Sequence, residues 1–258
     1  MSTIQKIRVQ DVHKSFGKKR VLNGVTFDVP AGESLVIIGG SGTGKSVTLK
    51  CILGLMKPEQ GTIEIDGEAM TGAPKAQRAA LRRKIGMLFQ GGALFDSLTV
   101  WENVAFALTE GRGKARAEAK PVALEKLAMV GLDEQVAALY PSELSGGMQK
   151  RVALARAIAA SPDILFFDEP TTGLDPIMAD VINDLIAASV KRLGATAVSI
   201  THDMASARKI ATNIAMLHEG RIVWHGPVGD IDHSGNEYVD QFVHGRAEGP
   251  IKMQVRAL

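Results

Sequence analysis

Residues 34–46 read SLVIIGGSGTGKS, and this stretch decides the fold. The first part, Ser34 to Ile38, has no polar alternation, as expected for a strand buried on both faces of a mostly parallel sheet. The second part fits the pattern G-x-x-x-x-G-K-[ST] and precedes a helix that we predict from Ser46 to Leu55. A strand, a glycine-rich loop and a helix in this order indicate an α/β fold of the P-loop NTPase type.

The glycine-rich loop supplies the groups that a bound phosphate needs. Glycines let backbone N–H groups curl around a phosphate, and the helix adds its positive N-terminal end. Lys45 is expected to neutralise the β- and γ-phosphates, and Ser46 to offer its hydroxyl to Mg²⁺. The loop alone does not separate kinases, GTPases and transport ATPases. Its predicted nucleotide-binding residues are Gly39, Gly40, Ser41, Gly42, Thr43, Gly44, Lys45 and Ser46.

The remaining segments predict three further parts around this loop. Residues 7–12 and 21–29 alternate apolar and polar positions about a polar turn, which predicts an N-terminal antiparallel hairpin. Residues 98–139 carry helical spacing with a polar break at 111–114, which predicts a helical insert. The predicted elements that follow are strands at 63–65, 164–167 and 195–200, helices at 150–160, 176–193 and 206–210, and a hairpin of 214–217 with 221–224.

Composition restricts the partners and the compartment. Lys and Arg total 30 against 28 for Asp and Glu, and no dense basic run accompanies aromatic residues, so we expect no nucleic-acid partner. Cys51 is the only cysteine, which rules out an internal disulfide and fits a reducing cytoplasm. Residues 1–12 lack the apolar core of a signal peptide, and the apolar runs are far shorter than the ~20 residues of a membrane span. Any membrane role is expected to pass through a partner.

Two carboxylates and a histidine follow predicted neighbouring strands. Residues 164–169 read ILFFDE, and carboxylates are costly beside a core unless they meet a cation or a proton-transfer task. Strand alternation should turn Asp168 towards the loop to hold Mg²⁺, and Glu169 towards the water that attacks the γ-phosphate. His202 follows the next strand and is expected to position that phosphate and the water.

A second phosphate-type site lies in residues 144–149, LSGGMQ. Ser145, Gly146 and Gly147 at a helix N-terminus offer hydroxyl and N–H donors to an anion. One chain rarely needs two such sites for one phosphate. A head-to-tail homodimer, in which each site closes over the nucleotide of the other subunit, accounts for both.

The order GGSGTGKS, Gln90, LSGGM, ILFFDE, Leu174-Asp175, His202 resembles the ABC ATPase family over almost the whole chain. The resemblance implies that the nucleotide is ATP, that Phe16 stacks on adenine, and that Gln90 senses Mg²⁺ and the membrane partner. It further implies that Ser145 to Gly147 clamp the partner subunit's ATP and that Asp175 couples the two sites. Two positions depart from the family pattern, because Phe16 replaces the commoner Tyr and Met148 stands where many members have Gln.

One ABC ATPase domain is therefore expected over residues 1–258. Residues 1–90 and 161–230 would form the catalytic α/β core with its β hairpins, residues 91–160 a helical subdomain, and residues 231–258 a C-terminal tail.

Residues 87–106, Met148 and the tail around Gln241 to Gly245 and Gly249-Pro250 resemble the Mla/Mce branch of that family. Gly91 stands where the branch usually has Ser. The branch implies lipid or phospholipid transport between inner and outer membranes, and a location on the cytoplasmic face of a bacterial inner membrane. The implied partners are a permease subunit, an Mce-type lipid-binding protein and a STAS-domain protein.

Several alternatives stay open at this point. The chain could serve an importer of another solute such as an amino acid, or a soluble ABC protein of DNA repair or translation. Those soluble proteins usually carry a long coiled coil or two fused ATPase copies, and this sequence has neither. A purely regulatory ATP-binding protein is disfavoured by Glu169 and His202. Leu94, Phe95 and Trp101 are either core residues or a groove for a permease helix, and the C-terminal tail is either frayed or docked.

Overall fold

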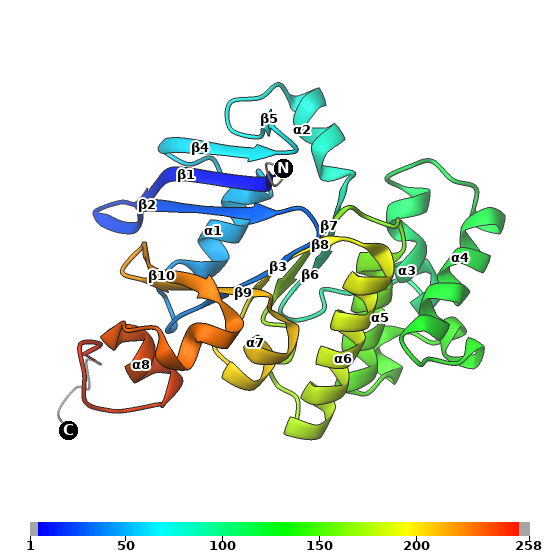
Figure 1. The fold of residues 1–258 in the computed structure, drawn as a ribbon. Helices are drawn as coiled ribbons and strands as arrows, with labels where there is room; N and C mark the ends of the chain where they lie inside the picture. Colours follow the sequence, from blue (N-terminus) through cyan, green and yellow to red (C-terminus); the bar gives the residue numbers. More distant parts are fainter. Residues whose placement is uncertain (1–4, 253–258) are drawn as a thin grey trace.

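A six-stranded sheet runs through the middle of the computed structural model, which describes residues 5–252 (Figure 1). Its strand order is β10-β9-β3-β8-β7-β6, with β10 antiparallel to β9 and the other neighbours parallel. The strands are β3 (Ser34–Ile38), β6 (Ile85–Leu88), β7 (Ile164–Asp168), β8 (Thr196–Ile200), β9 (Asn213–His218) and β10 (Arg221–Pro227).

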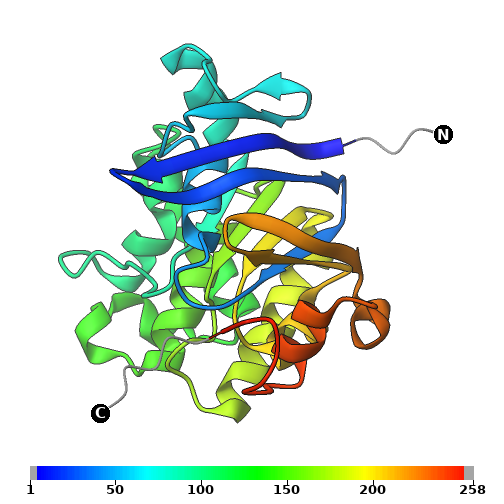
Figure 2. The same ribbon diagram turned by 90° about the vertical axis from the view of Figure 1, so that its left-hand side faces the viewer.

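A second, antiparallel sheet is formed mainly by the N-terminal part of the chain, and Figure 2 shows it from the side. Its order is β2-β1-β4-β5, built from β1 (Gln5–Phe16), β2 (Lys19–Pro30), β4 (Gln60–Ile65) and β5 (Glu68–Ala69). Phe16 pairs with Lys19 across a tight turn, so the predicted N-terminal hairpin is confirmed.

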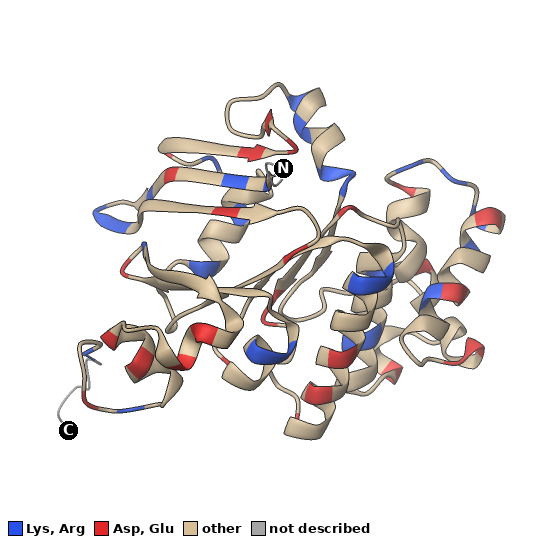
Figure 3. Cartoon of the chain, in the orientation of Figure 1, with Lys and Arg blue, Asp and Glu red and all other residues tan. Residues whose placement is uncertain are grey.

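Most of the helices pack around the main sheet, and one of them lies between it and the antiparallel sheet (Figure 1). Helix α1 (Lys45–Ile52) lies between the two sheets, and α2 (Lys75–Arg82) joins the antiparallel sheet to β6 (Figure 1). The other α-helices are α3 (Val100–Thr109), α4 (Arg116–Met129), α5 (Gly146–Ile158), α6 (Pro176–Leu193), α7 (Met204–Ile210) and α8 (Glu237–Val243). Short 3₁₀ turns span Glu134–Ala138, Pro141–Glu143 and Val228–His233. Along the ribbon, positions of Lys and Arg are interspersed with positions of Asp and Glu (Figure 3).

Strand alternation divides the buried side chains into two cores, one on each face of the main sheet. In β7, Ile164 and Phe166 pack towards α1 and the antiparallel sheet, whereas Leu165 and Phe167 pack towards helices α3 to α7. All four side chains are fully buried. An apolar run without alternation is therefore what this strand requires, because neither face meets water.

The structure corrects several predicted boundaries. Helix α1 ends at Ile52 rather than Leu55, and Gly54 beyond it adopts a φ of 63°, which an α-helix cannot contain. Helix α5 starts at Gly146, not Lys150, so the LSGGM residues form its cap and first turn. The first strand of the C-terminal hairpin, β9, also pairs with β3 and so extends the main sheet. Helices α2 and α8 were not predicted.

The C-terminal segment docks on its own chain. Gln241 of α8 is buried, and its Nε2 donates to the backbone oxygens of Arg246, at 3.1 Å, and Ile251, at 3.0 Å. The backbone N–H of Ile251 donates to Gln241 Oε1 at 2.7 Å. Of the two alternatives for the tail, docking holds up to residue 252. Within residues 5–252, no helix combines the length and the apolar character that crossing a membrane requires.

Candidate functional site

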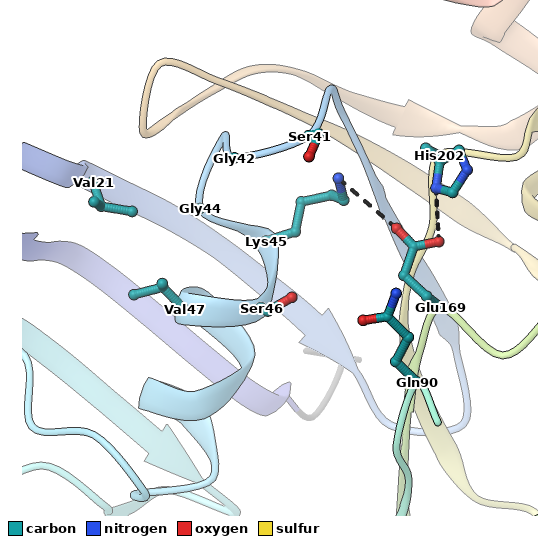
Figure 4. Close-up of a pocket in the computed structure, with 10 residues that line it drawn as sticks. All are labelled: Val21, Ser41, Gly42, Gly44, Lys45, Ser46, Val47, Gln90, Glu169 and His202. Atoms are coloured by element: carbon teal, nitrogen blue, oxygen red, sulfur yellow. Dashed lines mark ion pairs between the residues drawn. The ribbon is translucent and has the colours of Figure 1, made fainter. Parts of the chain in front are cut away.

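Loops at the carboxyl ends of β3, β6, β7 and β8 enclose a pocket of about 410 Å³ (Figure 4). This position follows from the parallel sheet, in which those strand ends share one edge. The lining residues are Val21, Ser41, Gly42, Gly44, Lys45, Ser46, Val47, Gln90, Glu169 and His202. The pocket thus collects much of the predicted loop together with Gln90, Glu169 and His202.

The glycine-rich loop needs glycine at Gly39 and Gly44. Gly39 has a φ of 150°, and a Cβ there would overlap the backbone oxygen of Leu217 in β9. Gly44 has a φ of 110°, and a Cβ there would lie 2.8 Å from Leu22 Cδ2. Both positions combine a left-handed backbone with close neighbours, so an L side chain is excluded twice over. These two contacts fix the loop between β9 and the N-terminal hairpin.

The Lys45 ammonium lies inside the loop that precedes it. Its Nζ donates to the backbone oxygens of Gly39, at 2.7 Å, and Gly40, at 3.0 Å, and lies 4.0 Å from Glu169 Oε1. Burial lowers the pKa of Lys45, and the Glu169 and Asp168 carboxylates oppose that shift. The positive charge is therefore held among acceptors in the loop that the sequence predicts to bind a nucleotide's terminal phosphates.

Glu169 has two bonded neighbours that fix its carboxylate. His202 Nδ1 lies 2.8 Å from Oε2, and Thr172 Oγ1 donates to the same oxygen at 3.2 Å. Strand β7 ends at Asp168, and Glu169 has a φ of 48°. Its direction is therefore set by a left-handed residue, and not by the strand alternation that the sequence suggested.

Asp168 and Ser46 fit the predicted Mg²⁺ site. Asp168 Oδ1 is buried, and within residues 5–252 it has no hydrogen-bond partner. Burial and the Glu169 carboxylate raise the pKa of Asp168, whereas Lys50, the Ser46 hydroxyl and Lys45 oppose the rise. A buried carboxylate oxygen without a donor, next to a hydroxyl, suits a cation that takes oxygen ligands.

Gln90 lies two residues beyond the end of β6 and lines the pocket beside Glu169 (Figure 4). Its neighbourhood contains exposed apolar side chains, because Phe89 is 39% and Phe95 is 42% exposed. Leu94 and Trp101 instead pack against the core of the helical lobe, so the alternative of core residues holds for these two. Phe95 stacks on Phe106 with a centroid distance of 4.4 Å.

The other predicted site residues lie outside this pocket. Ser145 caps α5 by accepting from Met148 N, and Gly147 packs against Met178 of α6. Asp175 caps α6 by accepting from the backbone N–H groups of Ile177 and Met178, both at 3.0 Å. Phe16 is 49% exposed at the tip of the hairpin. None of these four residues is among those that line the pocket in the described part of the chain.

Sequence reasoning missed four contributors to the site. Val21 and Val47 form an apolar wall, and Thr172 bonds Glu169. Lys150 is 7% exposed and donates to the backbone oxygen of Gln90. The signal for Lys150 was present, because it shares a helix face with the buried Ala153 and Ala157 and is therefore a lysine within an apolar stripe.

Comparison with known sequences finds one family and several relatives. The sequence model of the family described as "ABC transporter" matches residues 22–172. The probable ribonucleotide transport ATP-binding protein mkl of Mycobacterium leprae is 42% identical, over 96% of this chain and 71% of its own length. The histidine/lysine/arginine/ornithine transport ATP-binding protein HisP of Escherichia coli is 40% identical, over 86% and 90%. The intermembrane phospholipid transport system ATP-binding protein MlaF of Escherichia coli is 37% identical, over 97% and 93%.

Among solved structures, the fold resembles a dimeric ATP-binding cassette. The post-hydrolysis state of the cassette MJ0796 bound to ADP and Pi superposes with a TM-score of 0.79 at 35% identity. The match covers 86% of this chain and 98% of that one. The α/β fold with its P-loop and two sheets is thereby confirmed.

Proposed function

Because this chain belongs to the ABC transporter family and is the ATP-binding subunit of such a transporter, we propose that it hydrolyses ATP at this pocket to drive lipid transport. The observation that carries the ATPase part is the position of Glu169 between the Lys45 ammonium and the His202 ring. A carboxylate held there can accept the proton of a water that attacks the γ-phosphate.

The groups around Glu169 would bind the phosphates, orient the reacting atoms and hold Mg²⁺. Lys45 and the backbone N–H groups of the loop from Gly39 to Ser46 bind the β- and γ-phosphates. His202 orients Glu169 and the γ-phosphate. Ser46, Asp168 and Gln90 would hold Mg²⁺, which neutralises charge on the phosphate oxygens when it is bound.

Completion of the site requires a second copy of the chain. Ser145, Gly146 and Gly147 present donors at the start of α5 and do not line the pocket of their own subunit within residues 5–252. In a head-to-tail homodimer they cover the partner subunit's ATP, and Asp175 communicates between the two sites. Phe16, exposed at the hairpin tip, provides the platform for adenine. The dimeric state of the similar cassette supports this arrangement.

Lipid as cargo rests on the likeness to MlaF, whose match extends over 93% of that protein's length. Residues 87–106, Met148 and the tail after Gln241 carry the branch resemblance, and Gln241 organises that tail by three hydrogen bonds. HisP, at 40% identity, supports amino-acid import as the second candidate.

We infer that partner subunits form the path by which the transported molecule crosses the membrane. The exposed rings of Phe89 and Phe95 flank Gln90 and offer an apolar surface to a helix of a permease. We infer that this contact holds the chain at the cytoplasmic face of a bacterial inner membrane. An Mce-type lipid-binding protein and a STAS-domain protein complete the proposed assembly.

The test is purification of the intact complex in detergent from cells that express it at natural levels. Mass spectrometry then identifies both the co-purifying proteins and the bound small molecules. A permease with an Mce-type protein and phospholipid supports the proposal. A permease with a periplasmic amino-acid-binding protein, and ATP hydrolysis that amino acid stimulates, would replace lipid by the second candidate.

A further inference from the structure

Two cationic side chains of helix α5 donate hydrogen bonds to the loop that carries Gln90. Lys150 Nζ donates to the backbone oxygen of Gln90 itself. Arg156 Nη2 donates to the oxygen of Gly92, at 2.5 Å, and Nη1 to that of Ala93, at 2.7 Å. Figure 1 shows this segment, between β6 and α3, running past α5. Three backbone carbonyls of one loop are thus held by side chains of a single helix.

The loop depends on such outside support. It leaves β6, which is an edge strand and pairs only with β7 in the described part of the sheet. Gly92 and Ala93 have φ values of 75° and 49°, so the backbone cannot continue as helix or strand. Within residues 89–95, the one backbone hydrogen bond in the described structure runs from Gly92 N to Phe89 O, at 2.8 Å. Further along, Asn103 of α3 bonds the backbone of Phe95.

Within residues 5–252, the Lys150 ammonium has one hydrogen-bond acceptor, the backbone oxygen of Gln90. Lys150 is 7% exposed, and a buried ammonium is costly unless acceptors surround it. Its charge lies in the field of the Asp168 and Glu169 carboxylates. A Cβ on Gly92 would lie 3.6 Å from Ala153 Cβ, so the loop already packs closely against the same helix face.

We propose that Lys150, with Arg156 beside it, is a positioning residue that holds Gln90 in the nucleotide pocket and links it to the helix begun by Ser145, Gly146 and Gly147. When α5 moves as it binds the partner subunit's nucleotide, Gln90 moves with it, because the carbonyl of Gln90 is hydrogen-bonded to Lys150 of that helix. The kinetic part of the test rests on the proposed ATPase function, whereas the structural part does not.

The first measurement is hydrogen–deuterium exchange of the full-length protein. Lys150→Met removes the donor at nearly constant volume, and Lys150→Gln serves as the milder variant if the Met variant does not fold. Exchange in peptides covering residues 90–95 should rise about tenfold or more, the range expected for losing a hydrogen bond to a charged group. Lys126→Met is the matched control, because Lys126 is 8% exposed and its Nζ bonds Glu125 and Met129 in α4 instead.

The second measurement is steady-state ATP hydrolysis. Lys150→Met should lower kcat about tenfold while KM for ATP stays within about twofold, because the loop from Gly39 to Ser46 is untouched. Lys150→Arg should retain most of the wild-type rate, because the guanidinium is also a cationic donor that can bond the backbone oxygen of Gln90. The inference is overturned if Lys150→Met leaves exchange at residues 90–95 unchanged, or if Lys126→Met reproduces both effects. A wild-type chain without ATPase activity would instead refute the proposed function, and the exchange result would still decide the inference.

Discussion

The Glu169 carboxylate lies between two basic side chains, one at each of its oxygens. His202 Nδ1 is 2.8 Å from Oε2, and Lys45 Nζ is 4.0 Å from Oε1. His202 comes from the end of β8 and Lys45 from the start of α1, so the carboxylate joins two loops that are far apart in sequence. The His202 side chain is 61% exposed, whereas that of Glu169 is 11% exposed. A buried carboxylate with an exposed histidine partner can be reoriented from outside, by a nucleotide or a second subunit.

Replacement of Glu169 by Gln is expected to abolish turnover while ATP binding persists. The amide keeps the size of the side chain but cannot take a proton from water, which should cost a factor of about 10² to 10⁴ in rate. Lys45 and the phosphate loop remain, so ATP should still bind and hold the dimer. Phosphate release and light scattering with ATP measure the two effects. Glu125→Gln, on the exposed face of α4, is the control, and unchanged turnover in Glu169→Gln would remove the assigned role.

Asp168→Asn should make the isolated chain slightly more stable and its Mg²⁺ binding weaker. Burial, followed by the Glu169 carboxylate, raises the pKa of Asp168. A carboxyl whose folded pKa lies above its unfolded one destabilises the fold when it is ionised, at pH values above the folded pKa. That penalty disappears as the pH falls below it. The variant should therefore gain about 2 °C in Tm at pH 8 without Mg²⁺ or nucleotide, and less at about pH 4, close to the ordinary pKa of an aspartate carboxyl.

Differential scanning fluorimetry at the two pH values checks this, with a Mg²⁺ titration of the nucleotide-bound chain alongside. Asp163→Asn provides the control, because Asp163 immediately precedes β7, at its other end, and its side chain is 58% exposed. An equal gain in both variants, or a loss of stability in Asp168→Asn, would contradict the account of a buried and unsatisfied carboxylate.

Gly39→Ala and Gly40→Ala are expected to differ sharply although the two glycines are adjacent. A methyl group on Gly39 would overlap Leu217 O at a φ of 150°, whereas one on Gly40 would lie 3.7 Å from Thr43 Cγ2, in ordinary contact. Gly39→Ala should cost about 1–3 kcal/mol of unfolding free energy and most nucleotide affinity, and Gly40→Ala much less of each. Urea unfolding and binding of a fluorescent ATP analogue give both quantities. Equal losses would mean that the contact with β9 is not what fixes the loop.

The parts of this fold that were predictable are those with strong local signals. Strand β3 and helix α6 have the predicted bounds, because β3 is an uninterrupted apolar run before glycines, and α6 has Asp175 as its cap, Pro176 at its first position and Gly194 at its end. The phosphate loop, Glu169 and His202 were predicted for the same reason, since their motifs are contiguous and follow buried strands.

The parts that were missed depend on contacts distant in sequence. Strand β6 has four residues and is defined by its pairing with β7, so its own sequence carries little signal. The left-handed backbone of Glu169 and the bond from Lys150 to Gln90 are likewise visible only in three dimensions. Helix α2 has only eight residues, and Leu81 is the one side chain in it that is buried, so the segment is too short and too exposed to stand out from a polar loop in the sequence.

Ser145→Arg is expected to prevent the ATP-dependent dimer without preventing ATP binding by the monomer. Ser145 is exposed at the start of α5 and does not line the pocket of its own subunit, within the residues described, so a larger cation there leaves Lys45 and its loop unchanged. In a head-to-tail dimer the same position faces the partner's phosphates across a closed interface, and the longer side chain blocks closure.

Light scattering of the Ser145→Arg, Glu169→Gln double variant with ATP measures dimer formation, and equilibrium binding of ATP to the Ser145→Arg chain measures nucleotide binding by the monomer. Ala76→Arg adds the same charge at an exposed position of α2 and should dimerise normally. A Ser145→Arg chain that dimerises as well as this control would require both phosphate-type sites to act within one subunit, although Ser145, Gly146 and Gly147 do not line the pocket in the described part of the chain.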